Sequence, residues 1–252
     1  KIFIVIFAAL ALGLVIYSPN IYKLYRLANL YNEKSIAKNF ININNIFSNI
    51  SSSIPASEKP HIFETKDFDL PEKYSFEGEE LDLKEGLSHF HTDGLIILHD
   101  GKMLFEDYWN GNTKDSKHIS FSVAKSYLSA LFGIAIDEGL IDSIDDNVTK
   151  YLEDFVGTGY EDVKIKNLLQ MSSGIEFNED YADPNSDINK FSRASAKGQS
   201  FRDFAKSLKN GREQGTYNHY VSLDTQVLAM ILESVTDMPV REYLYKRIWN
   251  TI

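Results

Sequence analysis

The chain has 252 residues, with 26 lysines and arginines against 36 aspartates and glutamates, and therefore a formal net charge of −10. Hydrophobic residues make up 43% of the chain, which is enough apolar material to rule out a mostly disordered protein. The acidic balance argues against a nucleic acid as the main partner, because the phosphate backbone repels net negative charge. The chain has no cysteine, which excludes disulfides, thiolate metal sites and a cysteine nucleophile.

The first segment of the chain is uniformly apolar. Residues 2–17 carry no charge and follow Lys1. As a helix they would reach about 24 Å, and counting on to Tyr22 brings the length close to a hydrocarbon core of roughly 30 Å. We predict a signal anchor or signal peptide over residues 1–22, with an uncleaved anchor favoured and a buried core helix as the alternative. Either membrane interpretation implies export to the periplasm or another extracytoplasmic face.

Residues 23–60 have the composition of a connector. A mixed helical pattern over residues 23–40 is followed by a stretch, 42–60, that is rich in asparagine, serine and proline. Such a stretch is typical of a spacer that holds a domain away from a membrane. We therefore expect the globular domain to cover residues 61–252.

The globular part begins with strands and continues with helices. Two apolar runs flank Asp100 and Gly101, which is a strong signal for a β-hairpin over residues 94–109. The apolar spacing then predicts helices over residues 123–138, 164–171, 201–208, 223–235 and 240–249. Two strands followed by many helices do not alternate as a parallel α/β fold does, so the pattern favours an α+β fold. Two strands alone make no stable sheet, so further strands must pair with them.

Ser122 and Lys125 are candidates for nucleophilic catalysis. Ser122 opens the apolar helix predicted over residues 123–138, where the helix dipole would stabilise an oxyanion. Three residues are nearly one helical turn, so the Lys125 amine returns to the side of the serine hydroxyl and can accept its proton. We expect Lys125 to point into a packed interior. The alternative is a serine that only caps the helix beside a solvated lysine, and the same spacing also occurs by chance at Ser35 and Lys38 in the connector.

The wider context of Ser122 forms an ordered series of motifs. The series runs through residues 120–141, 143–152, 163–174, 215–222, 224–228 and 232–236. It resembles the serine β-lactamase and penicillin-binding-protein-like hydrolases, and most of all the class C-type branch with carboxylesterases and 6-aminohexanoate-dimer hydrolases. The resemblance covers residues 94–252 and implies a β-lactamase/transpeptidase-like α+β fold, with an antiparallel sheet flanked by helices and a mainly helical subdomain.

The resemblance also implies roles for individual residues. Ser122 matches the nucleophile of the family and Lys125 its base. Tyr220 matches the tyrosine that shuttles a proton between nucleophile and leaving group, and Ser222 a polar residue that faces the cleft. No metal or cofactor is implied. The alternative for Tyr220 is a half-buried aromatic residue whose hydroxyl is merely satisfied.

One family motif does not occur in the chain. The family closes its site with a strand that carries a Lys/His-Thr/Ser-Gly-like triplet and lends a second oxyanion donor. The sequence reaches Ile252 without such a stretch. We expect the last strands and this motif to lie beyond Ile252, and the alternative is a truncated protein without a complete site.

Two further groups of polar residues are weaker candidates. The acidic segment 177–187 could form a loop over the cleft and bring Tyr181 or Asp187 to the substrate, although a solvated loop is the simpler interpretation. His89 and His91, followed by Asp93, would share one face of a strand. Without a third histidine in a matching pattern they are a weak metal site.

The sequence therefore predicts a serine hydrolase that cleaves an ester or amide through an acyl-enzyme on Ser122. Its partners would be a small ester, amide or peptide substrate, and the membrane through the N-terminal segment. One alternative is a D-alanyl-D-alanine peptidase or β-lactamase that acts on cell-wall peptides or β-lactams. The other is a non-catalytic, membrane-anchored protein with the same fold.

Overall fold

The computed structural model describes residues 22, 25, 29–46, 53–196 and 198–252. The predicted apolar leader, residues 2–17, lies outside these residues. Within the described part of the chain, none of the helices combines the length and apolar character that crossing a membrane requires. The chain forms two compact units, one from residues 1–53 and 61–120 and the other from residues 54–60 and 121–252.

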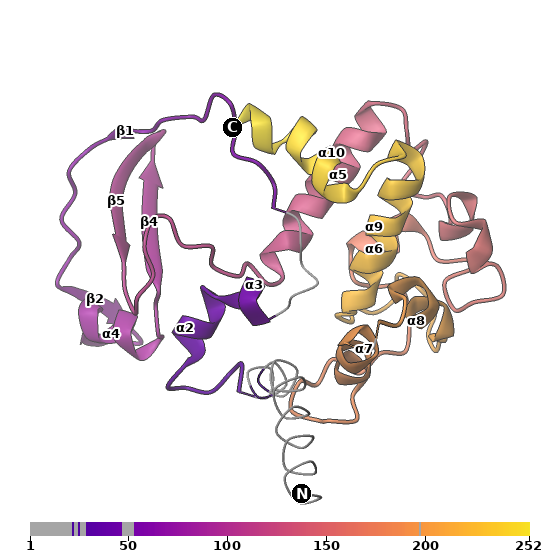
Figure 1. Cartoon of the computed structure of the whole chain (residues 1–252), viewed down its shortest axis with the longest axis horizontal. Coiled ribbons are helices and arrows are strands. Elements are labelled where there is room, and N and C mark those ends of the chain that lie inside the picture. Colours follow the sequence, from indigo (N-terminus) through magenta and orange to yellow (C-terminus); the bar gives the residue numbers. More distant parts are fainter. Residues whose placement is uncertain (1–21, 23–24, 26–28, 47–52, 197) are drawn as a thin grey trace, which may run out of the picture. The chain divides into compact units, whose positions relative to one another are not determined.

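The first unit contains the sheet (Figure 1). Its described elements are α2 (Ile36–Phe40), α3 (Ile43–Ile46), β1 (Glu64–Thr65), β2 (Lys73–Phe76), β3 (Glu79–Asp82), α4 (Leu83–His89), β4 (Gly94–His99) and β5 (Lys102–Tyr108). Strands β4 and β5 pair antiparallel in a three-stranded sheet of order β1-β5-β4, in which β1 runs parallel to β5. The strands β2 and β3, which the sequence analysis did not predict, form a separate antiparallel hairpin.

The predicted hairpin is confirmed in both its strands and its turn. Asp100 and Gly101 have φ values of 49° and 73°. Positive φ at both central residues matches a type I′ turn, whose twist fits the twist of the flanking strands. A register shift between Ile97 and Leu98 marks a bulge in the ladder.

The predicted strand around His89 is wrong. His89 is the last residue of α4, whose N-terminus is capped by the Asp82 carboxylate, which accepts the Glu85 N–H at 2.8 Å. His91 follows in a turn with φ of 50°, so the two imidazoles share no strand face. No group of three or more metal-ligating side chains occurs among the described residues.

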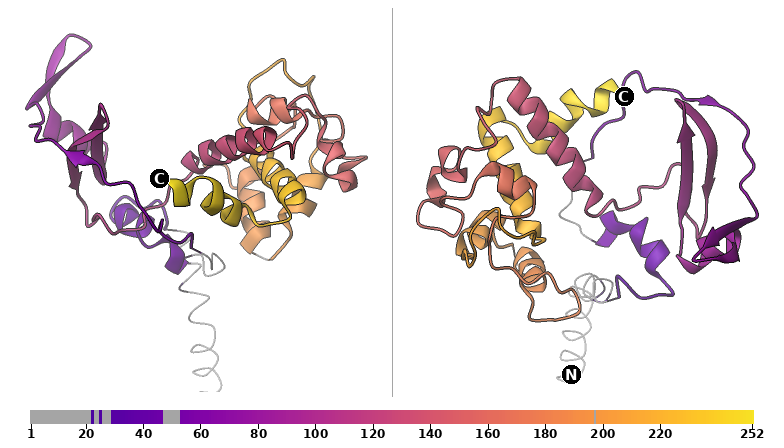
Figure 2. Two further views of the ribbon diagram at one scale, coloured as in Figure 1. Left: turned by 90° about the horizontal axis from the view of Figure 1, so that it is seen from above. Right: turned by 180° about the vertical axis from the view of Figure 1, so that it is seen from behind.

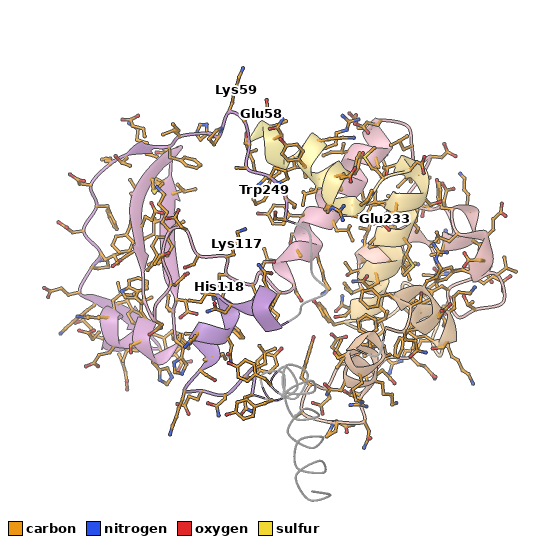
Figure 3. The ribbon with its side chains drawn as sticks, viewed as in Figure 1. Glu58, Lys59, Lys117, His118, Glu233 and Trp249 are labelled. Atoms are coloured by element: carbon orange, nitrogen blue, oxygen red, sulfur yellow. The ribbon has the colours of Figure 1, made fainter. Side chains whose placement is uncertain are left out.

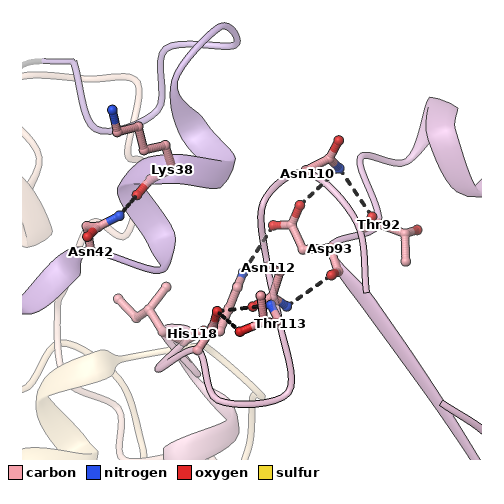
Figure 4. Close-up of polar contacts among 10 residues, drawn as sticks. Lys38, Asn42, Thr92, Asp93, Asn110, Asn112, Thr113 and His118 are labelled. Carbon is pink, nitrogen blue, oxygen red and sulfur yellow. Dashed lines mark hydrogen bonds and ion pairs between the residues drawn. The ribbon is translucent and has the colours of Figure 1, made fainter. Parts of the chain in front are cut away.

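Asp93 instead belongs to a polar network within the first unit (Figure 4). Its carboxylate lies 3.1 Å from His118 Nε2 and accepts a hydrogen bond of 3.1 Å from the Asn110 side chain. The other ring nitrogen of His118 lies 2.8 Å from the Ile119 carbonyl oxygen. This network holds the connection that leaves β5 against the start of β4.

The second unit is helical and contains the main core (Figures 1 and 2). Its described elements are α5 (Val123–Asp137), η1 (Val148–Lys150), η2 (Glu153–Phe155), α6 (Ile165–Leu169), α7 (Asp187–Ala196), α8 (Phe201–Ser207), α9 (Ser222–Thr236), α10 (Val240–Arg247) and η3 (Trp249–Thr251). The five helices predicted in this part of the chain are confirmed to within a few residues at each end. The sequence analysis did not predict α7.

Helices α5 and α9 supply much of the core. The buried residues of α5 are Leu128, Leu131, Phe132 and Ala135, which recur with the spacing of one helical face. Helix α9 packs against α5, α6, α8 and α10. Burying one such side chain contributes about 1.5–3 kcal/mol, so this packing holds α5 and α9 against each other.

Segment 54–60 returns to the C-terminal end of the second unit. The Ser57 hydroxyl donates to the Asn250 carbonyl oxygen at 3.2 Å, and the Glu58 N–H donates to the Asn250 side chain at 3.1 Å. The ring of Trp249 packs edge-on against Tyr127 of α5, with centroids 6.0 Å apart. Glu58 and Trp249 accordingly lie near each other in Figure 3.

Candidate active site

Ser122 stands immediately before α5 in a constrained backbone conformation. The preceding residue, Phe121, has φ of 44°, which is costly for a bulky side chain and is typical of residues held by their surroundings at functional sites. Ser122 itself is helical, and its side chain makes no capping hydrogen bond to α5. Its hydroxyl is therefore not occupied by the capping role that was the main alternative to a catalytic one.

Lys125 reaches the serine hydroxyl from one turn along α5. Its Nζ donates a hydrogen bond of 3.0 Å to Ser122 Oγ. The predicted juxtaposition of amine and hydroxyl is therefore present. The prediction that Lys125 points into a packed interior is wrong, because Lys125 is only half-buried and Ser122 is exposed. The buried stripe of α5 begins at Leu128, so the first turn of the helix extends beyond the core.

Tyr220, which lies 98 residues further along the chain, also contacts the Ser122 hydroxyl. Its phenol donates a hydrogen bond of 2.8 Å to Ser122 Oγ. The preceding residue is fixed by two contacts, because the His219 N–H donates to the Met171 carbonyl oxygen at 2.7 Å and His219 Nε2 lies 2.7 Å from the Phe177 carbonyl oxygen. Lys125 Nζ also lies 5.1 Å from the centre of the Tyr220 ring.

The three predicted catalytic side chains thus converge on one oxygen atom. Two groups that can exchange protons flank Ser122 Oγ at hydrogen-bonding distance. The Ser122 backbone N–H has no hydrogen-bond partner within the described part of the chain and stands at the positive end of α5. It can therefore donate to a negative oxygen that develops on a carbonyl attacked by Ser122.

Ser222 forms hydrogen bonds to Glu179, a residue that the sequence analysis did not identify as a candidate. Its hydroxyl donates to one oxygen of Glu179 at 2.5 Å, and its N–H donates to the other at 3.0 Å. Tyr181, whose side chain is exposed, also donates its hydroxyl to Glu179 at 3.0 Å. Glu179 belongs to the acidic segment 177–187 predicted near the cleft, and this is the one sequence signal that could have indicated it.

Asp187 begins α7 and stabilises the start of that helix. Its carboxylate accepts the Asn178 N–H at 2.9 Å and Lys190 Nζ at 3.0 Å. Partial burial acts to raise the pKa of Asp187, but these hydrogen bonds and the Lys190 charge hold the pKa below its usual value. Asp187 has no described contact with Ser122, Lys125 or Tyr220, so its contact with a substrate stays a prediction.

Asp224 is a buried acid in the first turn of α9. It has no solvent-exposed surface, and one carboxyl oxygen accepts the Tyr160 hydroxyl at 3.0 Å. Burial raises its pKa to about 7. Asp224 shares the apolar face of α9 with Val227 and Ile231, and an acid on such a stripe is the signal by which the sequence could have revealed it.

Comparison with known proteins places the chain in a family. The first unit contains an antiparallel hairpin, and the second contains the helices and the contacts of Ser122 with Lys125 and Tyr220, so the chain combines strands and helices as an α+β fold does. Residues 83–251 match the Beta-lactamase family model. The chain therefore belongs to the β-lactamase family.

Individual relatives point to the same family. The chain is 34% identical over 176 residues to the 6-aminohexanoate-dimer hydrolase of Paenarthrobacter ureafaciens, a match that covers 67% of the chain and 44% of that protein. It is 23% identical over 229 residues to an Escherichia coli K12 protein provisionally called a D-alanyl-D-alanine carboxypeptidase, covering 81% of the chain and 51% of the relative. The chain thus spans about half the length of these relatives.

The fold is shared with a solved structure. A Bacillus anthracis protein, provisionally called a 6-aminohexanoate-dimer hydrolase, superposes with a TM-score of 0.81 at 20% identity. The superposition covers 89% of the chain and 61% of that protein. At this identity the likeness establishes the fold alone, which is the β-lactamase/transpeptidase-like fold predicted from the sequence.

Proposed function

We propose that the protein is a serine hydrolase that cleaves an ester or amide bond through an acyl-enzyme on Ser122. The observation that carries this proposal is the convergence of Lys125 Nζ and the Tyr220 hydroxyl on Ser122 Oγ, at 3.0 and 2.8 Å. A serine hydroxyl is a weak nucleophile until a neighbouring base takes its proton. The two groups beside Ser122 Oγ are placed for that transfer.

The reaction has two halves that these residues can serve. Ser122 Oγ forms a bond to the substrate carbonyl carbon and loses its proton. The proton passes to the neutral amine of Lys125 or to the phenolate of Tyr220, whichever of the two acts as the base. The bond to the leaving alcohol or amine then breaks, and Tyr220 is positioned to return a proton to that group. Water hydrolyses the acyl ester by the reverse sequence, which releases the carboxylic acid and restores Ser122.

Simple esters and linear amides are the proposed substrates. The 34% identity to a 6-aminohexanoate-dimer hydrolase favours a linear amide, whereas the E. coli relative favours the alternative of a D-alanyl-D-alanine peptide. A non-catalytic protein of the same fold is the remaining alternative. The three possibilities make different predictions for one set of assays.

The test is hydrolysis by the full-length protein of a short acyl ester, a linear amide and a D-alanyl-D-alanine peptide. We expect turnover of the ester or the linear amide, and its loss in Ser122→Ala. Ser126→Ala, which removes a hydroxyl one turn further along α5, is the matched control and should retain activity. Turnover of the peptide alone would support the cell-wall alternative, and no turnover of any substrate would contradict the proposal.

We also propose that the protein is exported and held at the membrane by its N-terminal segment. The support is the uncharged run of residues 2–17 in the sequence. The test is fractionation of cells that make the full-length protein, followed by alkaline extraction of the membranes. Recovery in the cytoplasmic fraction would contradict this proposal.

A further inference from the structure

Tyr220 is the catalytic group whose position depends most on the surrounding structure, because 98 residues separate it from Ser122 along the chain. Its backbone is fixed on one side through His219, by the contacts described above. On the other side lies the start of α9, where Ser222 and Asp224 follow within four residues. The contacts that fix the start of α9 therefore also fix the Tyr220 hydroxyl.

Two carboxyl groups make those contacts. From the loop that precedes α7, Glu179 accepts both the hydroxyl and the N–H of Ser222, at 2.5 and 3.0 Å. From within the core, Asp224 accepts the hydroxyl of Tyr160, which is itself fully buried. Glu179 and Asp224 thus both hold the first turn of α9. Glu179 lies in a partly exposed loop, whereas Asp224 is fully buried.

The surroundings of Asp224 do not suit a charge. Its Oδ2 has no hydrogen-bond partner within the described residues, and Asp224 forms no ion pair among them. Burial raises the pKa of Asp224 and outweighs the hydroxyls of Ser173 and Tyr160, which act to lower it. The charge of Glu179 also acts to raise this pKa, and none of the three neighbouring residues supplies a positive charge. An un-ionised carboxyl would leave one polar group unpaired there, whereas a carboxylate would bury an uncompensated charge, which costs far more free energy.

We propose that Asp224 is a positioning residue for Tyr220 that works in its un-ionised form, and that its ionisation disturbs the start of α9 and lowers the reactivity of Ser122. This inference rests on the proposed serine hydrolase function and adds to it a pH-dependent control of the same site. The raised pKa of Asp224 places the transition near neutral pH. Glu179, which accepts three hydrogen bonds, positions Ser222 and Tyr181.

The experiment measures the rate at which a fluorophosphonate labels the full-length protein at pH 6.0 and pH 8.5. The variants are Asp224→Asn, which imitates the un-ionised acid, Asp224→Ala, and Asp203→Asn as the matched control. Asp203 is an exposed acid in α8 whose carboxylate makes no described hydrogen bond or ion pair. Circular dichroism at both pH values establishes that each variant is folded.

We expect the ratio of the Asp224→Asn rate to the wild-type rate to rise about fivefold or more between pH 6.0 and pH 8.5, since an acid one pH unit above its pKa retains about a tenth of its protons. Asp203→Asn should leave this ratio constant. Asp224→Ala, which removes the bond to Tyr160, should label more slowly than Asp224→Asn at pH 6.0.

Two outcomes would overturn the inference. Equal pH dependence of wild type and Asp224→Asn would show that ionisation of Asp224 does not control the site. An Asp224→Asn protein that is folded but as slow as Asp224→Ala at pH 6.0 would show that the charged form is the one required. Failure of the wild type to label at either pH is a distinct result, which would overturn the proposed function and this inference with it.

Discussion

The contribution of the Tyr220 hydroxyl to the reactivity of Ser122 can be measured by removing that hydroxyl alone. Tyr220→Phe removes only the oxygen that donates to Ser122 Oγ at 2.8 Å. Because a positioned acid or base contributes about 10²–10⁴-fold to a rate, we expect the labelling rate to fall by at least about 10²-fold. Tyr217→Phe, an exposed tyrosine three residues away that stacks on Arg212, is the control and should change the rate less than threefold in rough terms. A small effect of Tyr220→Phe would contradict the proton-transfer role.

Asp224 should also affect stability, independently of any activity. Its pKa is raised from 3.8 to about 7 in the folded protein, so the folded state binds the proton more tightly than the unfolded state. Relative to Asp224→Asn, the wild type should lose stability as pH rises from about 4 to about 7 and lose no more above that range. The total loss is on the order of 4 kcal/mol at most. Urea unfolding of both proteins from pH 4 to pH 8 measures it, and a constant difference would contradict the buried-acid interpretation.

At the scale of elements, two glycines in the second unit should respond to alanine in opposite directions. Gly174 follows α6 with φ of 80°, and a Cβ there would lie 2.2 Å from the Arg212 carbonyl oxygen. Gly133 lies within α5 with open space around it. We expect Gly174→Ala to destabilise the fold by more than about 2 kcal/mol, and Gly133→Ala to stabilise it by about 0.5–1 kcal/mol. Thermal unfolding measures both, and a neutral Gly174→Ala would contradict the close packing after α6.

The sequence predicted elements best where one local pattern decides the structure. The Asp100-Gly101 turn and the apolar faces of α5 and α9 depend on neighbouring residues, and these elements are confirmed. The hairpin of β2 and β3 was missed because its strands are rich in charged residues and its turn begins with Glu77, which takes a φ of 50°. β1 was missed because a two-residue strand has no periodicity.

The same distinction holds within the candidate site. The pairing of Ser122 with Lys125 follows from helical spacing, so residue patterns alone could propose it. Tyr220 lies 98 residues from Ser122 in the sequence and Glu179 lies 43 residues from Ser222, and no spacing rule connects either pair. For Tyr220 the family resemblance supplied the missing information. Glu179 and Asp224 had only weak signals in the sequence, an acidic segment and an acid on an apolar helix face, and the structure was needed to identify their partners.

At the scale of the whole molecule, the two units differ in how many buried apolar side chains they contain among the described residues. The second unit has a continuous cluster of buried side chains, while the smaller cluster in the first unit centres on Leu30 and Ile43. No residue of β4 or β5 is buried, and Ile96 and Leu98 remain about half exposed. In the 252-residue chain we expect amides of α5 and α9 to exchange with solvent at least about tenfold more slowly than those of β4 and β5. Hydrogen exchange measures this, and slower exchange in the sheet would contradict it.

The most direct test of the central claim is to identify the residue that an active-site-directed reagent modifies. The full-length protein is treated with a fluorophosphonate, digested, and analysed by mass spectrometry. The serine hydrolase proposal predicts one stoichiometric adduct on Ser122, absent from Ser122→Ala and slowed by Tyr220→Phe. Modification of another residue, or a folded protein that takes up no reagent, would contradict it.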